Sequence, residues 1–411
     1  MTEPLTCRFC HAPLTKTFVD LGATPLANSY LKNASGAAAE KSYPLHARVC
    51  GNCFLVQVED VVPAEDIFSD YAYFSSYSAS WVAHAKRYAD KLTERLGLDK
   101  NSLVVEIASN DGYLLKHFVE RQIPVLGIEP AANVARVAED VGVTTEVAFF
   151  GKETATRLAD TGKKADLMAA NNVMAHVPDI NDFIGGVPIL LADEGVFTIE
   201  FPHLLNLIEK VQFDTIYHEH YSYLSLLTVE KILSAHGLRV FDVEELETHG
   251  GSLRIYACHK AAGHEEGAGL AAIRAKEAKA GLDNLAAYQN FTPRVEHARD
   301  TLRTFLKKAK AEGKSVAGYG AAAKGNTLLN YCGVGTEDIA FVVDRNPEKQ
   351  DTLLPGSHIP VFSPDKIRSE KPDYVLILPW NLASEIAGEM ADVRDWGGKF
   401  AVPIPELTLL P

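Results

Sequence analysis

A stretch of nine residues, 104–112, constrains the fold of this chain most strongly. An apolar, β-branched run at 103–107 has the length and composition of a buried parallel strand. It breaks into small and polar residues, and 113–120 then has the pattern of a helix start. Because backbone N–H groups at a helix N-terminus lack partners, a strand, a tight turn and a helix can bind a polar ligand. The stretch therefore predicts an α/β domain with a ligand-binding turn.

A second apolar run, 125–128, ends in Glu129, whose carboxylate can accept hydrogen bonds from ribose hydroxyls. The first turn is poor in glycine, which argues against a dinucleotide pyrophosphate. The pattern Glu106-x-x-x-x-Asp111-Gly112 instead resembles the first motif of class I S-adenosylmethionine (SAM) methyltransferases, which usually carry glycine where this chain has Ala108. An α/β turn that binds no nucleotide is the alternative. The resemblance implies a SAM site formed by Glu106, Asn110, Asp111, Gly112, Glu129 and Asn171.

Length and charge limit the kind of protein this can be. At 411 residues the chain is too long for one core, and two or three domains are expected. A net charge of −14 disfavours nucleic acid or an anionic membrane as the main partner, although a local pocket can still bind an anionic small molecule. No apolar run approaches a membrane span, and the first residues lack the basic and apolar parts of a signal peptide. We expect a cytoplasmic protein.

Four of the six cysteines form two Cys-x-x-Cys pairs, Cys7 with Cys10 and Cys50 with Cys53. Two such pairs can place four thiolates tetrahedrally around one zinc ion and leave no open coordination position. In a reducing compartment this use is favoured over disulfides, and redox-active thiols are the alternative. The spacing predicts a small zinc-binding domain over 1–70.

The chain from 71 to 260 alternates between strand and helix patterns. After the two strands already described, further strands are expected at 143–149, 165–170, 195–200, 238–245 and 252–259. Helices are expected at 81–96, 131–141, 152–159 and 228–236, and 185–191 leads into the fifth strand. Five βα units followed by an antiparallel hairpin is the order of a class I methyltransferase domain. Ligands of such sheets lie outside the strand C-termini, so 171–176 and 200–203 should border the same crevice as the first turn.

Residues 261–411 predict a second α/β domain that closes the substrate cleft. A helical segment rich in Ala, Lys and Glu precedes a second strand–turn–helix unit at 315–326, which contains Gly318, Gly320 and Lys324. These three residues are candidates to contact the diphosphate of a nucleotide, although a surface position is the simpler explanation for Lys324. The glycine pattern is incomplete for a dinucleotide, so NAD binding is not expected here.

Histidine, glutamate and tyrosine are concentrated at 217–223. His218, Glu219 and His220 could bind a metal, but no third ligand follows at helical spacing. Acid–base chemistry is favoured, because histidine titrates near neutral pH and tyrosine can donate a hydrogen bond to an oxyanion. A solvated polar loop is the alternative.

Taken together, these motifs resemble the sugar C-methyltransferases of nucleotide-deoxysugar pathways, the C-3′-methyltransferase family of the tetronitrose and mycarose enzymes. Ala108 and His218 depart from that family's pattern. The shared motifs, in chain order, are the two Cys-x-x-Cys pairs, Tyr71-Ala-Tyr73-Phe-Ser-Ser, Glu106-Ile-x-x-Asn-Asp-Gly112, Gly127-Ile-Glu-Pro130, Asn171, His176-Val-Pro178, Phe213-Asp-x-Ile-Tyr-x-Glu-His220, His249-Gly-Gly and Gly318-Tyr-Gly-Ala-x-x-Lys324.

The resemblance implies SAM-dependent methylation, at C3, of a nucleotide-linked (commonly dTDP-linked) 4-keto-6-deoxysugar through an enolate. It implies that His220 is the base and that Glu219 orients neighbouring groups, with His176 as the alternative base or an enolate stabiliser. Tyr73 and Tyr217 would donate hydrogen bonds to the keto or enolate oxygen. Two other functions stay open, an NAD-dependent sugar-nucleotide oxidoreductase and a non-catalytic zinc-containing binding protein, and so does the oligomeric state.

Overall fold

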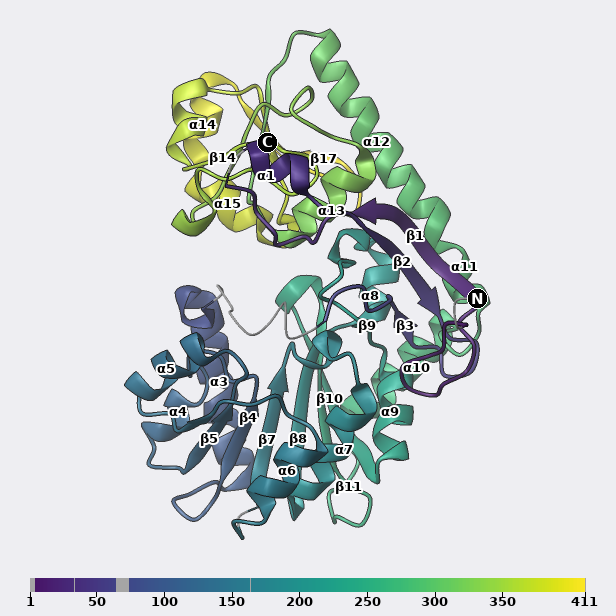
Figure 1. Cartoon of the computed structure of the whole chain (residues 1–411), viewed down its shortest axis with the longest axis vertical. Coiled ribbons are helices and arrows are strands. Elements are labelled where there is room, and N and C mark those ends of the chain that lie inside the picture. Colours follow the sequence, from purple (N-terminus) through teal and green to yellow (C-terminus); the bar gives the residue numbers. More distant parts are fainter. Residues whose placement is uncertain (1–3, 33, 64–73, 163, 411) are drawn as a thin grey trace.

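The computed structural model describes residues 4–32, 34–63, 74–162 and 164–410 (Figure 1). Tyr73, one of the expected site residues, lies outside these ranges. Three β-sheets organise the described part of the chain, and two of them are α/β sheets at opposite ends of the molecule. Among the described helices, none has the length and apolar character needed to cross a membrane.

The central sheet has seven strands in the order β10-β11-β8-β7-β4-β5-β6. Neighbouring strands from β8 to β6 run parallel, and the hairpin of β10 and β11 adds two antiparallel strands beside β8. Parallel strands followed by an antiparallel hairpin are what the βα alternation predicted. The strand bounds are β4 Val104–Ile107, β5 Val125–Ile128, β6 Thr145–Glu146, β7 Ala165–Asn171, β8 Leu191–Pro202, β10 Leu238–Leu246 and β11 Ser252–His259.

The helices of this domain lie on both faces of the sheet. Two expected elements are shorter than the sequence indicated, because β6 has two residues and the helix expected at 113–120 covers four. Their bounds are α3 Ala79–Leu96, α4 Lys116–Val119, α5 Ala132–Asp140, α6 Lys152–Ala159, α7 Ile180–Leu190, α8 Leu204–Glu209 and α9 Leu226–Ala235.

Helix α7 was not expected, since it contains two glycines and a proline. Its N-terminus is capped by Asp179, whose carboxylate accepts from the backbone of Asn181 and Asp182. A Cβ on Gly186 would come within 2.8 Å of the backbone of Gly151, so the glycine lets α7 approach the start of α6. The residues that weaken the helical pattern are thus the ones that allow its packing.

The N-terminal sheet is antiparallel, in the order β1-β2-β3-β9, and its last strand comes from the central part of the chain. The expected unit 1–70 therefore completes its sheet with residues that closely follow His220. The bounds are β1 Lys16–Thr24, α1 Ala34–Ala39, β2 Tyr43–Val49, β3 Val56–Gln57 and β9 Ser222–Tyr223.

The C-terminal sheet has six strands in the order β14-β13-β12-β15-β16-β17, parallel except for β17, as expected of a second α/β domain. Helix α12 runs from this domain to the N-terminal strands (Figure 1). The bounds are α10 Ala268–Ala280, α11 Ala286–Gln289, α12 Phe291–Ala311, β12 Val316–Tyr319, α13 Ala323–Cys332, β13 Val342–Val343, β14 Val361–Phe362, α14 Asp365–Glu370, β15 Tyr374–Ile377, α15 Ala383–Glu389, β16 Lys399–Val402 and β17 Thr408–Leu410.

The cores of these three parts are continuous. One buried cluster joins Leu45 of the N-terminal sheet to Phe213 of the central part and Leu329 of the C-terminal domain. A second cluster joins the cysteine pairs to the central sheet. Because burial of apolar surface is the main stabilising force, the N-terminal sheet is held by both α/β domains and acts as a joint between them.

Candidate active site

The four cysteines converge as the spacing predicted. Their sulfur atoms all lie within 4.8 Å of one another. In each pair the residue after the second cysteine has a positive φ, 59° at His11 and 67° at Phe54, and its N–H bonds back to the carbonyl of the first cysteine. Four sulfur donors at this distance fit one tetrahedral zinc ion. A closed sulfur set leaves no position for substrate, so the metal's chemistry here is to hold the two turns together.

The turn after β4 has an unusual backbone. Ala108, Asn110 and Gly112 have φ angles of 53°, 50° and 77°, all in the left-handed region. A Cβ on Gly112 would lie 3.1 Å from Val141 and Val143 and 3.3 Å from the Cα of Ala138, so this position requires glycine. Ala108 occupies a conformation that glycine, the usual residue of the motif that this turn resembles, adopts without strain.

The end of β4, the turn after it and the end of β7 hold several buried acceptor atoms without a hydrogen-bond partner among the described residues. A buried acceptor without a donor is costly, so such atoms indicate a ligand. SAM brings the complementary groups, which are an ammonium, ribose hydroxyls and an adenine amine, and the residues therefore fit it. The atoms are Glu106 Oε2, Ser109 Oγ, Asp111 Oδ1, Asn171 Oδ1 and Asn172 Oδ1.

The crevice is also acidic. Burial raises the pKa of Glu106 well above its usual range, and the nearby carboxylates of Asp111, Glu129 and Glu200 raise it further, against a hydrogen bond from Tyr113. Burial also raises the pKa of Glu129. A cationic ligand would relieve this repulsion, and SAM carries two positive charges, on its sulfonium and its ammonium.

Glu129 has a further task in this structure. Its two carboxylate oxygens accept from the backbone N–H groups of Asn110 and Ala131, each at 2.9 Å. Asn110 and Asp111 in turn accept from the backbone of Ser75 and Ser76 at 2.9 and 3.0 Å. The end of the Tyr- and Ser-rich segment is therefore tied to the first turn, which brings the chain beside Tyr73 to the same crevice.

The expected acid–base residues meet at the C-terminal edge of the central sheet. The Tyr217 hydroxyl lies 2.8 Å from His220 Nε2, and His220 Nδ1 lies 2.8 Å from the carbonyl of Thr215. His176, on the 3-10 turn Met174–His176 after β7, places its Nδ1 2.9 Å from the carbonyl of Glu219. The rings of His176 and His220 are 4.6 Å apart.

Both histidines have their protonation fixed by these contacts. A carbonyl can only accept, so Nδ1 of each ring carries the proton, and Nε2 of His220 accepts from Tyr217. Burial lowers the pKa of His176 to about 4. Burial, with smaller contributions from neighbouring cationic groups, lowers the pKa of His220 well below its usual value, against the bond to Thr215. Two neutral imidazoles thus lie side by side at pH 7.

Glu219 faces away from His220. Both of its carboxylate oxygens lie 2.8 Å from Nδ2 of Asn28, on the N-terminal sheet side, and burial raises its pKa. The sequence did not reveal that Asn28 is the partner of Glu219, because Asn28 lies 191 positions away and belongs to no recognisable motif. His218 also points elsewhere, with Nε2 3.1 Å from the carbonyl of Pro44.

The second turn brings Lys324 into the space between the domains. Its Nζ lies 2.6 Å from Asn381 Oδ1 and 4.5 Å from the centre of the Trp380 ring, so it is not a simple surface lysine. Trp380 donates to Asp214 at 2.7 Å, which links the C-terminal domain to the loop that carries Tyr217. Burial lowers the pKa of Lys324 and raises that of Asp214 to about 6.

The glycines of the second turn have a local explanation. A Cβ on Gly318 would lie 2.7 Å from Val342, and one on Gly320 would lie 2.4 Å from Pro379. Asp344, where a dinucleotide fold keeps an acid for ribose, accepts instead from the backbone of Ala321 at 2.7 Å. These groups already have partners within the protein, which disfavours the NAD-dependent alternative.

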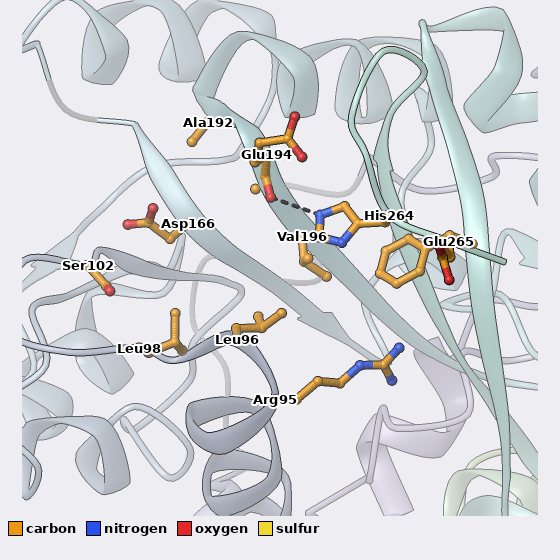
Figure 2. Close-up of a pocket in the computed structure, with 12 residues that line it drawn as sticks. Arg95, Leu96, Leu98, Ser102, Asp166, Ala192, Glu194, Val196, His264 and Glu265 are labelled. Atoms are coloured by element: carbon orange, nitrogen blue, oxygen red, sulfur yellow. Dashed lines mark hydrogen bonds between the residues drawn. The ribbon is translucent and has the colours of Figure 1, made fainter. Parts of the chain in front are cut away.

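A hollow of about 480 Å³ lies at the opposite edge of the central sheet (Figure 2). Ser102, Asp166 and Gly195 place it at the N-terminal ends of β4, β7 and β8, with His264 bonded to the carbonyl of Glu194. Ligands of parallel sheets bind outside the carboxyl ends of the strands. The acid–base cluster and the SAM turn are at that other edge, so this hollow is not part of the site.

The strand order and the first turn with its unpaired acceptors are those of a SAM-dependent methyltransferase. Three family models match the chain in succession. The first is named for zinc binding and matches residues 7–68, the second is a methyltransferase domain at 81–243, and the third is a C-methyltransferase C-terminal domain at 247–405.

One curated relative matches nearly the whole chain. This is C-methyltransferase NovU of Streptomyces niveus, 40% identical over 97% of this chain and 95% of the relative. The chain belongs to this C-methyltransferase family, and it is an enzyme with a SAM-binding domain and a zinc-binding domain.

Solved structures with bound SAM resemble part of the chain. Magnesium protoporphyrin IX methyltransferase ChlM of Synechocystis PCC 6803 is 14% identical, over 49% of this chain and 100% of that chain, with a TM-score of 0.36. The glycopeptide N-methyltransferase MtfA is 13% identical, over 46% and 96%, with a TM-score of 0.35.

Proposed function

We propose that the enzyme methylates C3 of a nucleotide-linked 4-keto-6-deoxysugar, with dTDP as the expected nucleotide. The observation that carries this proposal is the Tyr217–His220 pair, a buried neutral imidazole with a phenol 2.8 Å from its acceptor nitrogen. Carbon methylation needs a carbanion, and a carbon beside a ketone is the kind of carbon from which such a base can remove a proton.

His220 accepts the C3 proton on Nε2, and the electrons of the C–H bond move into a C3–C4 double bond as the C4 oxygen becomes an enolate. As Nε2 takes up that proton, the single O–H of Tyr217 turns from Nε2 to the enolate oxygen and donates to it, with Tyr73 expected as a second donor. Glu106, Asn110, Asp111, Gly112, Glu129 and Asn171 would hold SAM, whose sulfonium–methyl bond would break as C3 accepts the methyl group and leave S-adenosylhomocysteine. Thr215 holds the His220 ring, so the proton arrives at a fixed nitrogen.

His176 has two open roles in this scheme. Its ring is 4.6 Å from that of His220, and its orientation is set by the Glu219 carbonyl. It can stabilise the enolate by hydrogen bonding, or it can be the base itself. Glu219 orients this part of the site through its backbone and through its carboxylate bond to Asn28.

The nucleotide is proposed to lie against the C-terminal domain, where Lys324 supplies positive charge next to Gly318 and Gly320. Support for Lys324 is its contact with the ring of Trp380, which donates to Asp214, and its electrostatic interaction with His220. We also propose the division into 1–70, 71–260 and 261–411, because each range supplies most of the strands of one of the three sheets.

The test is incubation with a dTDP-4-keto-6-deoxysugar in D₂O, with SAM and, separately, with S-adenosylhomocysteine. We expect a C3-methyl product with SAM and deuterium uptake at C3 with S-adenosylhomocysteine. Methylation at oxygen, or neither product nor exchange from zinc-replete protein, would falsify the proposal. A UDP-linked sugar run in parallel separates an incorrect nucleotide from an incorrect reaction.

Variants separate the two histidines. His220→Ala is expected to lower turnover roughly 10²- to 10⁴-fold and to abolish deuterium uptake, with the affinity for S-adenosylhomocysteine unchanged. If His176 is the base, His176→Ala loses exchange and His220→Ala keeps it. His259→Ala is the control, because this half-buried ring also bonds a backbone carbonyl, at 3.3 Å, but on β11 far from the cluster.

The pH dependence follows from the lowered pKa values. The base must be neutral, and a base whose pKa lies below the usual value of 6.5 stays neutral to lower pH. We expect the acid limb of kcat/KM to lie well below pH 6.5. An acid limb centred near 6.5 would contradict the burial that the structure assigns to His220.

A further inference from the structure

Arg8 stands between the two cysteines of the first zinc pair and has no role in the chemistry described so far. Its side chain is 9% exposed although its charge has a single carboxylate partner among the described residues, Asp60, which is itself 49% exposed. An arginine so deeply buried beside an exposed acid gains little from that ion pair. Its other contacts explain the burial better.

Those contacts reach both catalytic segments. Arg8 Nη1 donates to the carbonyl of Pro178 at 2.8 Å, two residues after His176. The guanidinium also lies over the ring of Tyr221, with 5.3 Å between Cζ and the ring centre, one residue after His220. Nη2 donates to the carbonyl of Val58 at 2.6 Å, and Val58 N–H donates to the carbonyl of Tyr221.

The backbone of Arg8 is fixed by the zinc turn. Its N–H donates to the amide oxygen of Gln57 at 2.9 Å, and the amide nitrogen of Gln57 lies 3.2 Å from the sulfur of Cys7. Asn181 at the start of α7 donates to the carbonyl of Arg8 at 3.1 Å. The side chain therefore extends from a rigid base only when the cysteines are gathered, which is the state that zinc stabilises.

We propose that Arg8 is a positioning residue that couples the zinc turn to the two histidines, by holding the Pro178 carbonyl and the Tyr221 ring in one arrangement. The planar guanidinium suits this task, since it donates in two directions and presents a face to an aromatic ring, which an ammonium cannot do together. The proposal rests on the function proposed above for what the histidines do, but the placement of the rings can be measured without substrate.

The experiment compares Arg8→Ala and Arg8→Lys with Arg48→Ala, the control. Arg48 lies on β2 of the same sheet, is 21% exposed and pairs with Glu59 at 3.5 Å. Each variant is measured for zinc content, for affinity toward S-adenosylhomocysteine, for imidazole ¹⁵N signals of His176 and His220 against pH, and for kcat and KM.

In Arg8→Ala we expect full zinc content and unchanged affinity for S-adenosylhomocysteine, while both imidazole pKa values move up toward 6.5 as water reaches the loosened loops. We expect kcat to fall about 10- to 100-fold with little change in KM, because the histidines rather than the binding groups are displaced. Arg8→Lys should lie between the wild type and Arg8→Ala, and Arg48→Ala should match the wild type in every measurement.

Two results would overturn the coupling. One is an Arg8→Ala protein whose histidine signals are those of the wild type. The other is loss of zinc or of S-adenosylhomocysteine binding in both Arg8 variants, which would make Arg8 a residue of the fold in general. A sugar substrate that is not turned over leaves the ¹⁵N comparison intact, so failure of the proposed function is distinguishable from failure of this inference.

Discussion

The chain contains two strand–turn–helix units of similar shape, one after β4 and one after β12, and they differ in what their polar groups do. In the first unit Glu106 on β4 and Asp111 in the turn each keep a buried acceptor atom without a partner among the described residues. In the second turn Asp344 accepts from Ala321, whose carbonyl in turn accepts from Lys349 at 2.7 Å. The acids of the two units thus differ, because Glu106 and Asp111 each keep an acceptor that a ligand could use, whereas both oxygens of Asp344 accept from the protein backbone.

The largest effect is expected for Glu106→Gln in the first turn. Loss of a charged acceptor for a cationic ligand costs about 1.5–3 kcal/mol, so the affinity for SAM should fall roughly 10- to 100-fold. Calorimetric titration with SAM measures this. Unchanged affinity would mean that Glu106, like the polar groups of the second turn, serves the protein fold rather than SAM.

The same variant makes a stability prediction with a definite sign. The folded-state pKa of Glu106 lies above its ordinary value of 4.5, so the protonated form stabilises the fold below pH 4.5, and this contribution is lost as the pH rises through the folded pKa. Ligand-free Glu106→Gln should therefore be more stable than the wild type at pH 8, with the difference shrinking toward pH 4. Thermal unfolding at both pH values checks it.

Gly112→Ala should be the next largest change. The added Cβ meets Val141 and Val143 at 3.1 Å in a left-handed conformation, which costs about 1–3 kcal/mol of unfolding free energy. Chemical denaturation measures the loss. Gly162→Ala is the matched control for strain alone, because that glycine also has a positive φ, 80°, but an added methyl group would meet no atom of the described residues within 4 Å.

Asp344→Asn tests the second turn. The amide keeps the shape but replaces one acceptor by a donor, facing the N–H groups of Ala321 and Asn346 at 2.7 and 2.8 Å. We expect a loss of about 1–2 kcal/mol in stability and no change in SAM affinity. A protein of normal stability that has lost nucleotide binding would show instead that this carboxylate serves a ligand.

The smallest effect is expected for Ala108→Gly. Relief of the left-handed strain at φ 53° is worth about 1–2 kcal/mol, and the extra freedom of glycine in the unfolded chain offsets about half of it. A small rise in the unfolding temperature should follow. A fall would indicate that the methyl group of Ala108 contributes packing that outweighs the strain.

Much of the fold could be predicted from patterns in the sequence. The alternation of strand and helix patterns predicted parallel strands that end in an antiparallel hairpin, and the four cysteines predicted their own convergence. Helix α7 was missed because its glycines serve a close contact with α6, and contacts between helices are not visible in a local pattern. The third strand was overextended for the same reason, since only pairing with β5 ends it at Glu146.

The candidate site, like the fold, could be predicted from the sequence only in part. The residue types at His176, Tyr217 and His220 are informative by themselves, because few side chains can exchange a proton near neutral pH. The residues that hold these side chains in place cannot be recognised from the sequence. Thr215 acts through a carbonyl that every residue has, and Asn28 and Arg8 are brought to the site from the other end of the chain. The sequence by itself determined which chemical groups are present and which strands carry them. Only the tertiary structure decided which nitrogen of each ring holds the proton and which acceptors stay unpaired, because the first depends on how the loops place backbone carbonyls and the second on contacts between segments far apart in the chain.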